Sequence, residues 1–251
     1  MTAPALTRPA ARYHTHLAAG PADVAAAQRL RHEVFAREGG ALLGPESLAD
    51  GLDVDEWDEH CDHLLVREKL TGQVVGTYRL LAPERAAALG RGYSDGEFDL
   101  ARLDGLRPGL VEAGRSCVHP DHRNGAVINQ LWAGIARYVF EAGHLYLGGC
   151  ASVSVADGGA TAAGVWDVVR HGHLAPARLR VTPHRPFDVE GPARPEILVM
   201  PPLLRAYLKL GALVCGRPAY DEDFGTADFY VLLRIMDVPP RILRQLLGAP
   251  R

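Results

Sequence analysis

The sequence predicts a single domain of mixed α and β structure, of the α/β or α+β class. Short alternating apolar runs, typical of strands, are interleaved with longer runs at helical spacing. Neither an internal repeat nor a long polar linker divides the 251 residues, of which 47% are hydrophobic. A chain of this length and composition can bury a core of its own. We therefore expect one sheet covered by helices.

The amino-terminal part begins with a lead-in that we expect to be disordered over residues 1–13. Residues 21–37 begin with Pro-Ala-Asp and place apolar side chains on one face, which predicts the first helix. Residues 38–62 are rich in glycine and aspartate, which predicts a long structured loop. Two strand patterns follow at 63–68 and 73–81, and the Lys-Leu-Thr-Gly between them indicates a β-hairpin.

The central and carboxy-terminal parts alternate between helix and strand patterns. After a short helix over 83–89 and a loop, a third strand is expected over 110–118, with a helix from about Arg123 to Ala142. The remaining expected elements are a strand at 144–155, a helix at 157–172, a proline-rich connection at 183–202, a short helix at 201–211, a strand pair at 212–216 and 228–235, and a last amphipathic helix at 239–248.

Charge, hydropathy and cysteine content narrow the classes of function. A net charge of −3 and a pI near 6.4 favour neither nucleic acid nor an anionic membrane surface as a partner. No apolar run approaches the roughly 18 residues of a spanning helix, and the first residues lack the apolar core of a signal peptide. The cysteines are too dispersed for a zinc or thioredoxin motif, so we expect free thiols in the cytoplasm. They are Cys61, Cys117, Cys150 and Cys215.

The strand over 110–118, Leu-Val-Glu-Ala-Gly-Arg-Ser-Cys-Val, carries charges that are costly to bury. Glu112 and Arg115 lie three residues apart in an otherwise apolar pattern, so each needs a partner. Strand alternation projects Glu112 to one face, and Arg115 and Cys117 to the other, unless a bulge intervenes. Arg79 and Arg31 are further charges within apolar patterns. Each alone is explained by a structural ion pair or a solvated edge, but together they favour a functional site.

The turn after this strand, His-Pro-Asp-His-Arg-Asn-Gly-Ala, opens the predicted helix. Arg123, Asn124, Gly125 and Ala126 would lie where the unpaired N–H groups of a helix N-terminus suit a phosphate. The alternative is an ordinary proline and glycine turn into a helix. His119 and His122 flank the proline, which prevents a regular helical pairing, and we expect no metal site there.

These segments together resemble a known family. "RHEVF" (31–35), "DVDEWDEHCDHLLV" (53–66), "GQVVGTYRLL" (72–81), "EFDL" (97–100) and "VEAGRSCVHPDHRNG" (111–125) occur in the order seen in acyl-homoserine-lactone synthases. The chain is more similar to the ornithine lipid synthesis N-acyltransferases, often labelled hemolysin-like, from about Gln28 to Leu233. Its most specific segments are the late Pro-Pro-Leu-Leu and Asp-Phe-Gly-Thr-Ala-Asp-Phe. The resemblance implies the GCN5-related N-acyltransferase (GNAT) fold, a central mixed, mostly antiparallel, twisted sheet flanked by helices.

The resemblance also implies an activity. It predicts transfer of a fatty acyl group, a 3-hydroxy one in this family, from acyl carrier protein to the α-amine of L-ornithine, giving lyso-ornithine lipid. No bound cofactor or metal is implied. The phosphate turn lacks the full Gly-x-Gly signature of acetyl-CoA users, so the acyl carrier protein is the expected donor and acyl-CoA the alternative. Open alternatives are another acceptor (glycine, lysine or S-adenosylmethionine, as in a signal synthase) and a non-catalytic acyl-carrier-binding module.

Residue roles follow from the same resemblance. Glu112 is predicted to be the general base, and the backbone N–H groups of Ser116, Cys117 and Val118 to hold the oxyanion. Cys117 as a covalent nucleophile ranks below Glu112, because no histidine lies at a local spacing that would pair with it. Residues 123–126 are expected to bind the donor's phosphopantetheine. Predicted acceptor-binding and positioning residues are Arg31, Phe35, Trp57, Asp55, Asp58, Arg79 and Arg115.

The acidic segment and the carboxy terminus are each open to two interpretations. Asp53, Asp55, Asp58 and Asp62 either provide the counter-charge for the distal ammonium of ornithine or form a solvated acidic surface. The last helix places Ile242, Leu243, Leu246 and Leu247 on one side. It either covers the core or touches the inner face of a membrane peripherally. We expect one acyltransferase domain over 14–251, with this helix as its carboxy-terminal extension.

Overall fold

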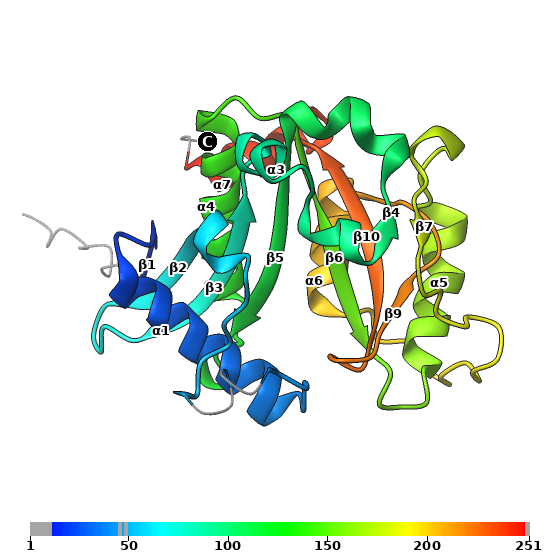
Figure 1. Ribbon diagram of the computed structural model, residues 1–251, viewed down its shortest axis with the longest axis horizontal. Helices are drawn as coiled ribbons and strands as arrows, with labels where there is room; N and C mark the ends of the chain where they lie inside the picture. Colours follow the sequence, from blue (N-terminus) through cyan, green and yellow to red (C-terminus); the bar gives the residue numbers. More distant parts are fainter. Residues whose placement is uncertain (1–11, 45–46, 48–49, 249–251) are drawn as a thin grey trace, which may run out of the picture.

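The protein is described by a computed structural model over residues 12–44, 47 and 50–248. Its centre is an eight-stranded sheet in the order β1-β2-β3-β5-β6-β10-β8, with β9 paired to β10 (Figure 1). The strands are β1 (Tyr13–Leu17), β2 (Asp62–Glu68), β3 (Val74–Leu81), β5 (Leu110–Val118), β6 (Tyr146–Ser154), β8 (Leu213–Val214), β9 (Ala219–Asp221) and β10 (Thr226–Arg234). Only the β5–β6 pair is parallel among these strand pairs, so the predicted mixed, mostly antiparallel sheet is confirmed.

Helices cover both faces of the sheet. They are α1 (Pro21–His32), α3 (Pro83–Leu89), α4 (Ala126–Glu141), α5 (Ala160–Gly172), α6 (Pro202–Leu210) and α7 (Pro240–Leu247). Short turns are the π-helix η1 (Glu33–Glu38) and the 3-10 segments η2 (Asp58–His60), η3 (Tyr93–Gly96), η4 (Ala101–Gly109), η5 (Pro120–His122), η6 (Ala177–Leu179) and η7 (Ile235–Asp237). A separate two-stranded ribbon pairs β4 (Phe98–Asp99) with β7 (Thr182–Pro183). No helix in the described ranges has both the length and the apolar character required to cross a bilayer.

Most predicted elements are confirmed, but the short strands β4, β7 and β9 were not predicted, and three further differences concern longer elements. Strand β1 was not predicted, and it begins at the buried Tyr13, inside the expected lead-in, of which residues 1–11 lie outside the described residues. The first helix continues as the π-helix η1 instead of one α-helix through residue 37. Helix α4 begins at Ala126 rather than near Arg123, because Gly125 takes a left-handed conformation at φ +85°.

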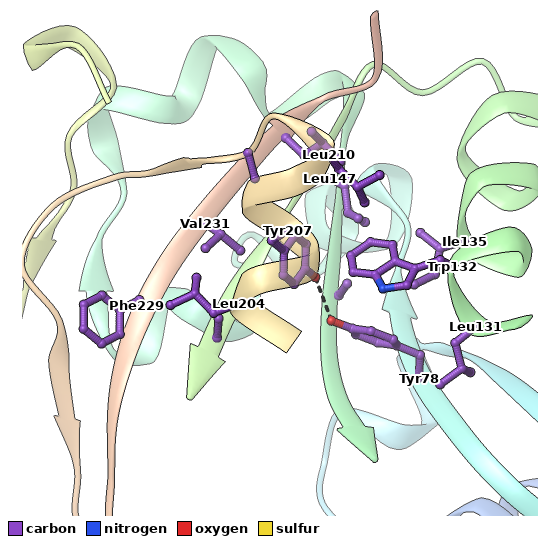
Figure 2. Close-up of a cluster of buried hydrophobic side chains, with 14 of the residues drawn as sticks. Tyr78, Leu131, Trp132, Ile135, Leu147, Leu204, Tyr207, Leu210, Phe229 and Val231 are labelled. Atoms are coloured by element: carbon purple, nitrogen blue, oxygen red, sulfur yellow. Dashed lines mark hydrogen bonds between the residues drawn. The ribbon is translucent and has the colours of Figure 1, made fainter. Parts of the chain in front are cut away.

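The main core lies between the sheet and the helices α4, α5 and α6, which cover one of its faces. Figure 2 shows side chains of α4 and α6 packed with those of β3, β6 and β10 around Tyr78, Trp132 and Tyr207, and residues of α5 and β5 belong to the same cluster. Ile242, Leu243 and Leu246 of α7 pack against the same cluster, so the apolar side of this helix covers the core. Helix α1 covers the opposite face of β2, β3 and β5.

Strands β5 and β6 separate soon after they begin. They pair from Leu110–Glu112 against Tyr146–Gly148, although each strand is nine residues long. Gly149 lies where they part, at φ +149°, and a Cβ there would be 2.1 Å from the carbonyl oxygen of Ala113. Only glycine allows so close an approach of two backbones. The divergence opens a cleft in the middle of the sheet.

Candidate active-site cleft

A β-bulge shapes strand β5 at the edge of this cleft. Thr77 pairs with Cys117 and Arg79 with Gly114, so Arg115 and Ser116 together oppose Tyr78 alone. Arg115 has φ +50°, a conformation that non-glycine residues rarely adopt. The extra residue reverses the alternation beyond it. Glu112 and Arg115 therefore contact the same residue, Tyr93, rather than projecting to opposite faces.

The cleft holds a cavity of about 330 Å³ that passes between the two parts of the sheet. Its polar wall carries Tyr93 and Arg115 on one side and Ser152, Asp221 and Asp228 on the other. The remaining lining residues are Val34, Phe35, Gly39, Ala41, Tyr78, Ala113, Gly114, Ser116, Cys150, Ser154, Leu203, Phe224 and Thr226. The lining thus combines charged groups with apolar side chains, which suits a substrate that has both a charged part and an apolar chain.

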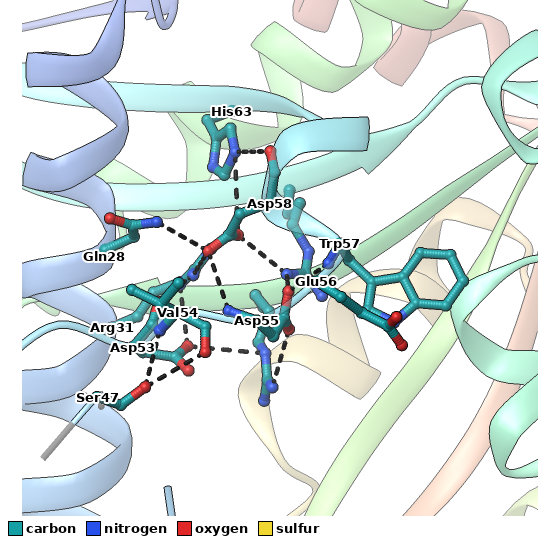
Figure 3. A network of polar contacts seen from close by, with 12 residues as sticks. Gln28, Arg31, Ser47, Asp53, Val54, Asp55, Glu56, Trp57, Asp58 and His63 are labelled. Carbon is teal, nitrogen blue, oxygen red and sulfur yellow. Dashed lines mark hydrogen bonds and ion pairs between the residues drawn. The ribbon is translucent and has the colours of Figure 1, made fainter. Parts of the chain in front are cut away.

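The predicted arginines and aspartates form one network beside the cleft (Figure 3). Arg31 is buried and donates to Asp58 at 2.8 Å. Arg79 also donates to Asp58, at 3.0 Å, and its other carboxylate partner is Asp55. Arg115 reaches Asp55 at 3.2 Å, and Asp53 pairs with Arg31 at 2.9 Å. The sequence therefore identified residues that do come together.

This network leaves little negative charge uncompensated. Burial alone would raise the pKa of Asp58, but Arg31 and Arg79 hold that pKa well below its usual range. The pKa of Asp55 is also lowered, because Arg79 and Arg115 outweigh the effect of burial. Asp62 pairs with Arg85 at 2.9 Å. The aspartates of the acidic segment are thus paired with arginines rather than forming a solvated acidic surface, and their role as counter-charge for a second ammonium group stays a prediction.

The opposite wall holds carboxylates that lack such partners. Asp228 on β10 is 4% exposed, and Thr226 donates to it at 2.7 Å. The thiol of Cys150 lies 3.8 Å from Glu97. In the described part of the chain no basic side chain forms an ion pair with Asp228, Asp221 or Glu97. The cleft therefore has an arginine on its β5 wall and unneutralised carboxylates on its β9–β10 wall.

The protonation of this carboxylate pair is unusual. Burial, with the adjacent charge of Asp221, raises the pKa of Asp228 to about 6. Burial and Asp228 raise the pKa of Glu97 to about 9. A carboxyl beside a carboxylate shares a proton with it. The ligand atoms of Glu97, Cys150 and Asp228 lie within 4.8 Å of one another, which is a metal-like spacing, but burial also keeps the Cys150 thiol protonated by raising its pKa.

Comparison with known proteins gives the family. An acetyltransferase (GNAT) domain model matches residues 30–133. An L-ornithine N(alpha)-acyltransferase of Rhodobacter capsulatus is 39% identical over 237 residues, which cover 88% of this chain and 89% of that protein. The protein of the same name from Agrobacterium fabrum is 34% identical over 248 residues, covering 91% and 83%. The chain belongs to this acyltransferase family.

Solved structures agree on the fold. The CoA-dependent acyl-homoserine lactone synthase BjaI has a TM-score of 0.55 at 20% identity, covering 96% of this chain and 92% of its own. The acyl-homoserine lactone synthase LasI has a TM-score of 0.54 at 14% identity, covering 95% and 96%. The predicted GNAT fold, the resemblance and the acyltransferase class are therefore confirmed.

Glu112 of this acyltransferase does not line the cleft. Its carboxylate accepts hydrogen bonds from the backbone N–H groups of Tyr93, at 2.7 Å, and Ser94, at 2.6 Å. It faces a second, largely apolar cavity of about 440 Å³ shared with Tyr230. Burial raises the pKa of Glu112, against the effect of these hydrogen bonds. The geometry gives Glu112 a clear structural role in anchoring η3, and its predicted role as base stays a prediction.

Cys117 and Trp57 also lie outside the cleft. Cys117 packs between α1 and the sheet, and burial raises the pKa of its thiol to about 12. A neutral thiol without a base is a poor nucleophile. Trp57 packs edge-to-face on Tyr93 at 5.8 Å, so it supports the cleft wall from behind. Phe35 and Ser116 do line the cleft, whereas Val118 packs against the main core.

The predicted donor turn is a compact structure of its own. Arg123 makes two hydrogen bonds to Glu38, at 2.5 and 2.7 Å, and one to the Val118 carbonyl. The Asn124 side chain accepts from the backbone N–H of Ala126. A donor phosphate would therefore have to share Arg123 with Glu38. This arrangement links the turn at the start of α4 to the π-helix η1.

The sequence analysis missed Asp228, Cys150 and Glu97 as functional candidates in this acyltransferase. The sequence did contain a signal for Asp228 and Glu97. Asp228 opens the apolar run of β10, and Glu97 stands in the "EFDL" segment. The strand order brings Asp228 on β10 beside β6, the strand that carries Cys150, and Glu97 lies 3.8 Å from that thiol.

Proposed function

We propose that this protein transfers a fatty acyl group from the thioester of acyl carrier protein to the α-amine of L-ornithine, giving lyso-ornithine lipid. Acyl-CoA is the alternative donor. The names of its relatives support the acceptor. The observation that carries the proposal is the pair of oppositely charged walls in one cleft, with Arg115 on β5 and Asp221 and Asp228 on β9 and β10. A diamino acid presents the complementary carboxylate and ammonium groups.

The acceptor enters from the polar end of the cleft in this proposal. Arg115 lies 4.4 Å from the Phe224 ring and is held by Asp55, so its guanidinium is fixed in position to bind the α-carboxylate of ornithine. Asp221, which is partly exposed and has no basic partner in the described part of the chain, takes the distal ammonium. The α-amine between these contacts then faces the bulge of β5.

The donor thioester lies at the bulge, where the strands part. The backbone N–H of Ser116 supports the developing oxyanion, because a bulge leaves backbone groups free of the strand ladder. The acyl chain extends toward Tyr78, Ala113 and Leu203 at the apolar end of the cavity. The phosphopantetheine phosphate lies toward the start of α4, near Arg123.

Asp228 is the proposed proton acceptor. A base with a pKa of about 6 is ionised at neutral pH and close enough to neutrality to take a proton from an amine as it attacks. The amine nitrogen bonds to the thioester carbon, the carbon–sulfur bond breaks, and the proton of the amine passes to Asp228. The released thiolate takes up a proton from solvent to form the thiol of the carrier arm, and Asp228 returns the amine proton to solvent.

The proposal is tested by combining the purified protein with a fatty acyl carrier thioester and L-ornithine. We expect Nα-acylornithine by mass spectrometry and release of the free thiol. Asp228→Asn is expected to lower turnover by about 10²- to 10⁴-fold, the range for loss of a general base. Asp167→Asn is the matched control and should keep full activity, because Asp167 is partly exposed on α5, pairs with Arg170 and Arg194, and does not line the cleft.

Glu112→Gln separates the two candidate bases. If Glu112→Gln abolishes turnover in a folded protein while Asp228→Asn retains it, the base is Glu112, as the family resemblance implies. Acylation of glycine or lysine in preference to ornithine would overturn the acceptor. A protein that binds the acyl carrier thioester without releasing thiol would be the non-catalytic module.

A further inference from the structure

The turn η3 is fixed by several hydrogen bonds where the cleft and the second cavity adjoin. The buried carboxylate of Glu112 accepts from the backbone N–H groups of Tyr93 and Ser94, one on each oxygen. The side chain of Asp95 accepts from the backbone N–H of Gly92 at 2.6 Å. The backbone on both sides of Tyr93 is therefore held by side chains rather than by the strand ladder.

Tyr93 is the residue of η3 that lines the cleft. Its ring packs edge-to-face on Trp57, and the guanidinium carbons of Arg79 and Arg115 lie 5.3 and 5.8 Å from the ring centroid. These contacts fix the ring, but the hydroxyl has no hydrogen-bond partner among the residues that the structure describes. The Tyr93 hydroxyl is therefore available to a ligand in the cavity.

This hydroxyl is a hydrogen-bond donor at neutral pH. Burial raises the pKa of Tyr93, and the opposing effect of the Arg115 charge is smaller, so the phenol keeps its proton. Arg115 uses Nη2 to reach Asp55 at 3.2 Å, while its Nη1 donates to no atom of the described residues. Two available donors on neighbouring side chains of one wall match the two oxygens of a carboxylate.

We infer that Tyr93 is an acceptor-binding residue, whose hydroxyl donates to one oxygen of the α-carboxylate while Arg115 donates to the other. Glu112 is then a positioning residue, because it holds the backbone of Tyr93 and does not itself line the cleft. This inference rests on the proposed function. It gives the buried glutamate of β5 a part in the reaction that involves no proton transfer.

The first test is Tyr93→Phe, which keeps the ring and removes the hydroxyl. With the hexadecanoyl thioester of acyl carrier protein at saturation, the KM for L-ornithine should rise by about 10- to 100-fold, as expected for loss of a hydrogen bond to a charged group. The kcat should change by less than about threefold. The second ligand is 1,4-diaminobutane, which is ornithine without its carboxylate. Its inhibition constant against ornithine should be the same in Tyr93→Phe as in the parent.

The second test is Glu112→Gln, whose amide cannot accept from both backbone N–H groups of η3. The KM for L-ornithine should rise, while the kcat at saturating ornithine and the pH dependence of that kcat should match the parent. In the Tyr93→Phe background, Glu112→Gln should change the KM by less than about threefold, because both variants disturb one contact. A lower kcat with a shifted pH profile would instead make Glu112 a proton-transfer group and overturn its positioning role.

Tyr146→Phe and Glu141→Gln are the matched controls. Tyr146 is half-buried like Tyr93, Glu141 is exposed on α4, and neither lines the cleft. Both variants should keep the KM and kcat of the parent. An unchanged KM for ornithine in Tyr93→Phe, or an equal loss of affinity for ornithine and 1,4-diaminobutane, would overturn the inference. No turnover of ornithine by the parent would count against the proposed function instead.

Discussion

Individual charged residues fall into two kinds in this cleft. Arg31 and Arg79 are buried and are neutralised by Asp53, Asp55 and Asp58, and these ion pairs fix the position of the loop before β2. Asp228 and Glu97 are also largely enclosed, but each lacks a basic partner in the described residues. Buried charge without a partner is costly and is tolerated where chemistry needs it. This contrast separates the carboxylates that have arginine partners from those that we propose to take part in the reaction.

The Glu97 carboxyl should make stability depend on pH in an unusual direction. Burial and the neighbouring Asp228 raise the folded-state pKa of Glu97 to about 9, from 4.5 for an unperturbed glutamate. The folded state therefore binds the proton more tightly than the unfolded state. The resulting stabilisation is complete below pH 4.5 and is lost as the pH rises through 9. Glu97→Gln should not show this loss of stability. The urea midpoint of the variant minus that of the parent should therefore be larger at pH 9 than at pH 5.5.

The control for this measurement is Glu141→Gln, at the exposed end of α4, which should leave the pH dependence of the parent unchanged. A midpoint difference between Glu97→Gln and the parent that is constant with pH would show that Glu97 titrates alike in both states. The raised pKa of Asp228, which depends on the same pair, would then be in doubt as well.

Sequence patterns identified the residues of the ion-pair network better than the carboxylates that we propose to react. Arg79 and Arg115 stood out because a charge within an apolar strand pattern needs a partner. Asp228 begins its apolar run, where an acidic residue is unremarkable, and Cys150 looks like any small core residue. What makes them a site is the pairing of β6 with β10, which joins residues about 80 positions apart. Single-sequence patterns hold no information on such pairings.

At the scale of elements, strand β5 combines two irregularities that a periodic pattern does not specify. The bulge at Arg115 and Ser116 depends on the register with β3, and the early separation from β6 depends on Gly149. The strand itself was predicted because its apolar alternation is local. β1 was missed because "YHTHL" has two histidines in five residues and gains its place from pairing with β2.

Gly149 gives a direct test of how the cleft is opened. Gly149→Ala places a methyl group 2.1 Å from the Ala113 carbonyl oxygen at a φ of +149°, so the two backbones must move apart. We expect a loss of about 1–3 kcal/mol in the free energy of unfolding, the usual cost of overpacking. Gly105→Ala is the control, because nothing lies within 4 Å of the added carbon. Equal stability of the two variants by urea denaturation would contradict a tight approach of β5 and β6.

At the scale of the molecule, the sheet consists of two parts, β1-β2-β3-β5 and β6-β10-β8 with β9. The short parallel pairing of β5 with β6 joins them at one end. At the other end, residues 33–42, which we call the strap, cross the opening. Phe35 meets Phe224 edge-to-face at 5.7 Å, and the N–H of Leu42 donates to the Asp223 carbonyl at 2.7 Å. The strap thus closes the cleft over Arg115.

Removing the Phe224 ring should loosen this closure. Phe224→Ala deletes both the contact with Phe35 and the aromatic face that lies 4.4 Å from Arg115. We expect amide hydrogen exchange to increase in peptides covering the strap and the β9–β10 turn, while α4 keeps its protection. The KM for the amino acid should also rise, because Arg115 loses a surface that holds its guanidinium in place. Phe140→Ala, an exposed position on α4, serves as the control. Unchanged exchange in the strap of Phe224→Ala would mean that the Leu42–Asp223 and Glu38–Arg123 contacts hold it closed without the aromatic pair.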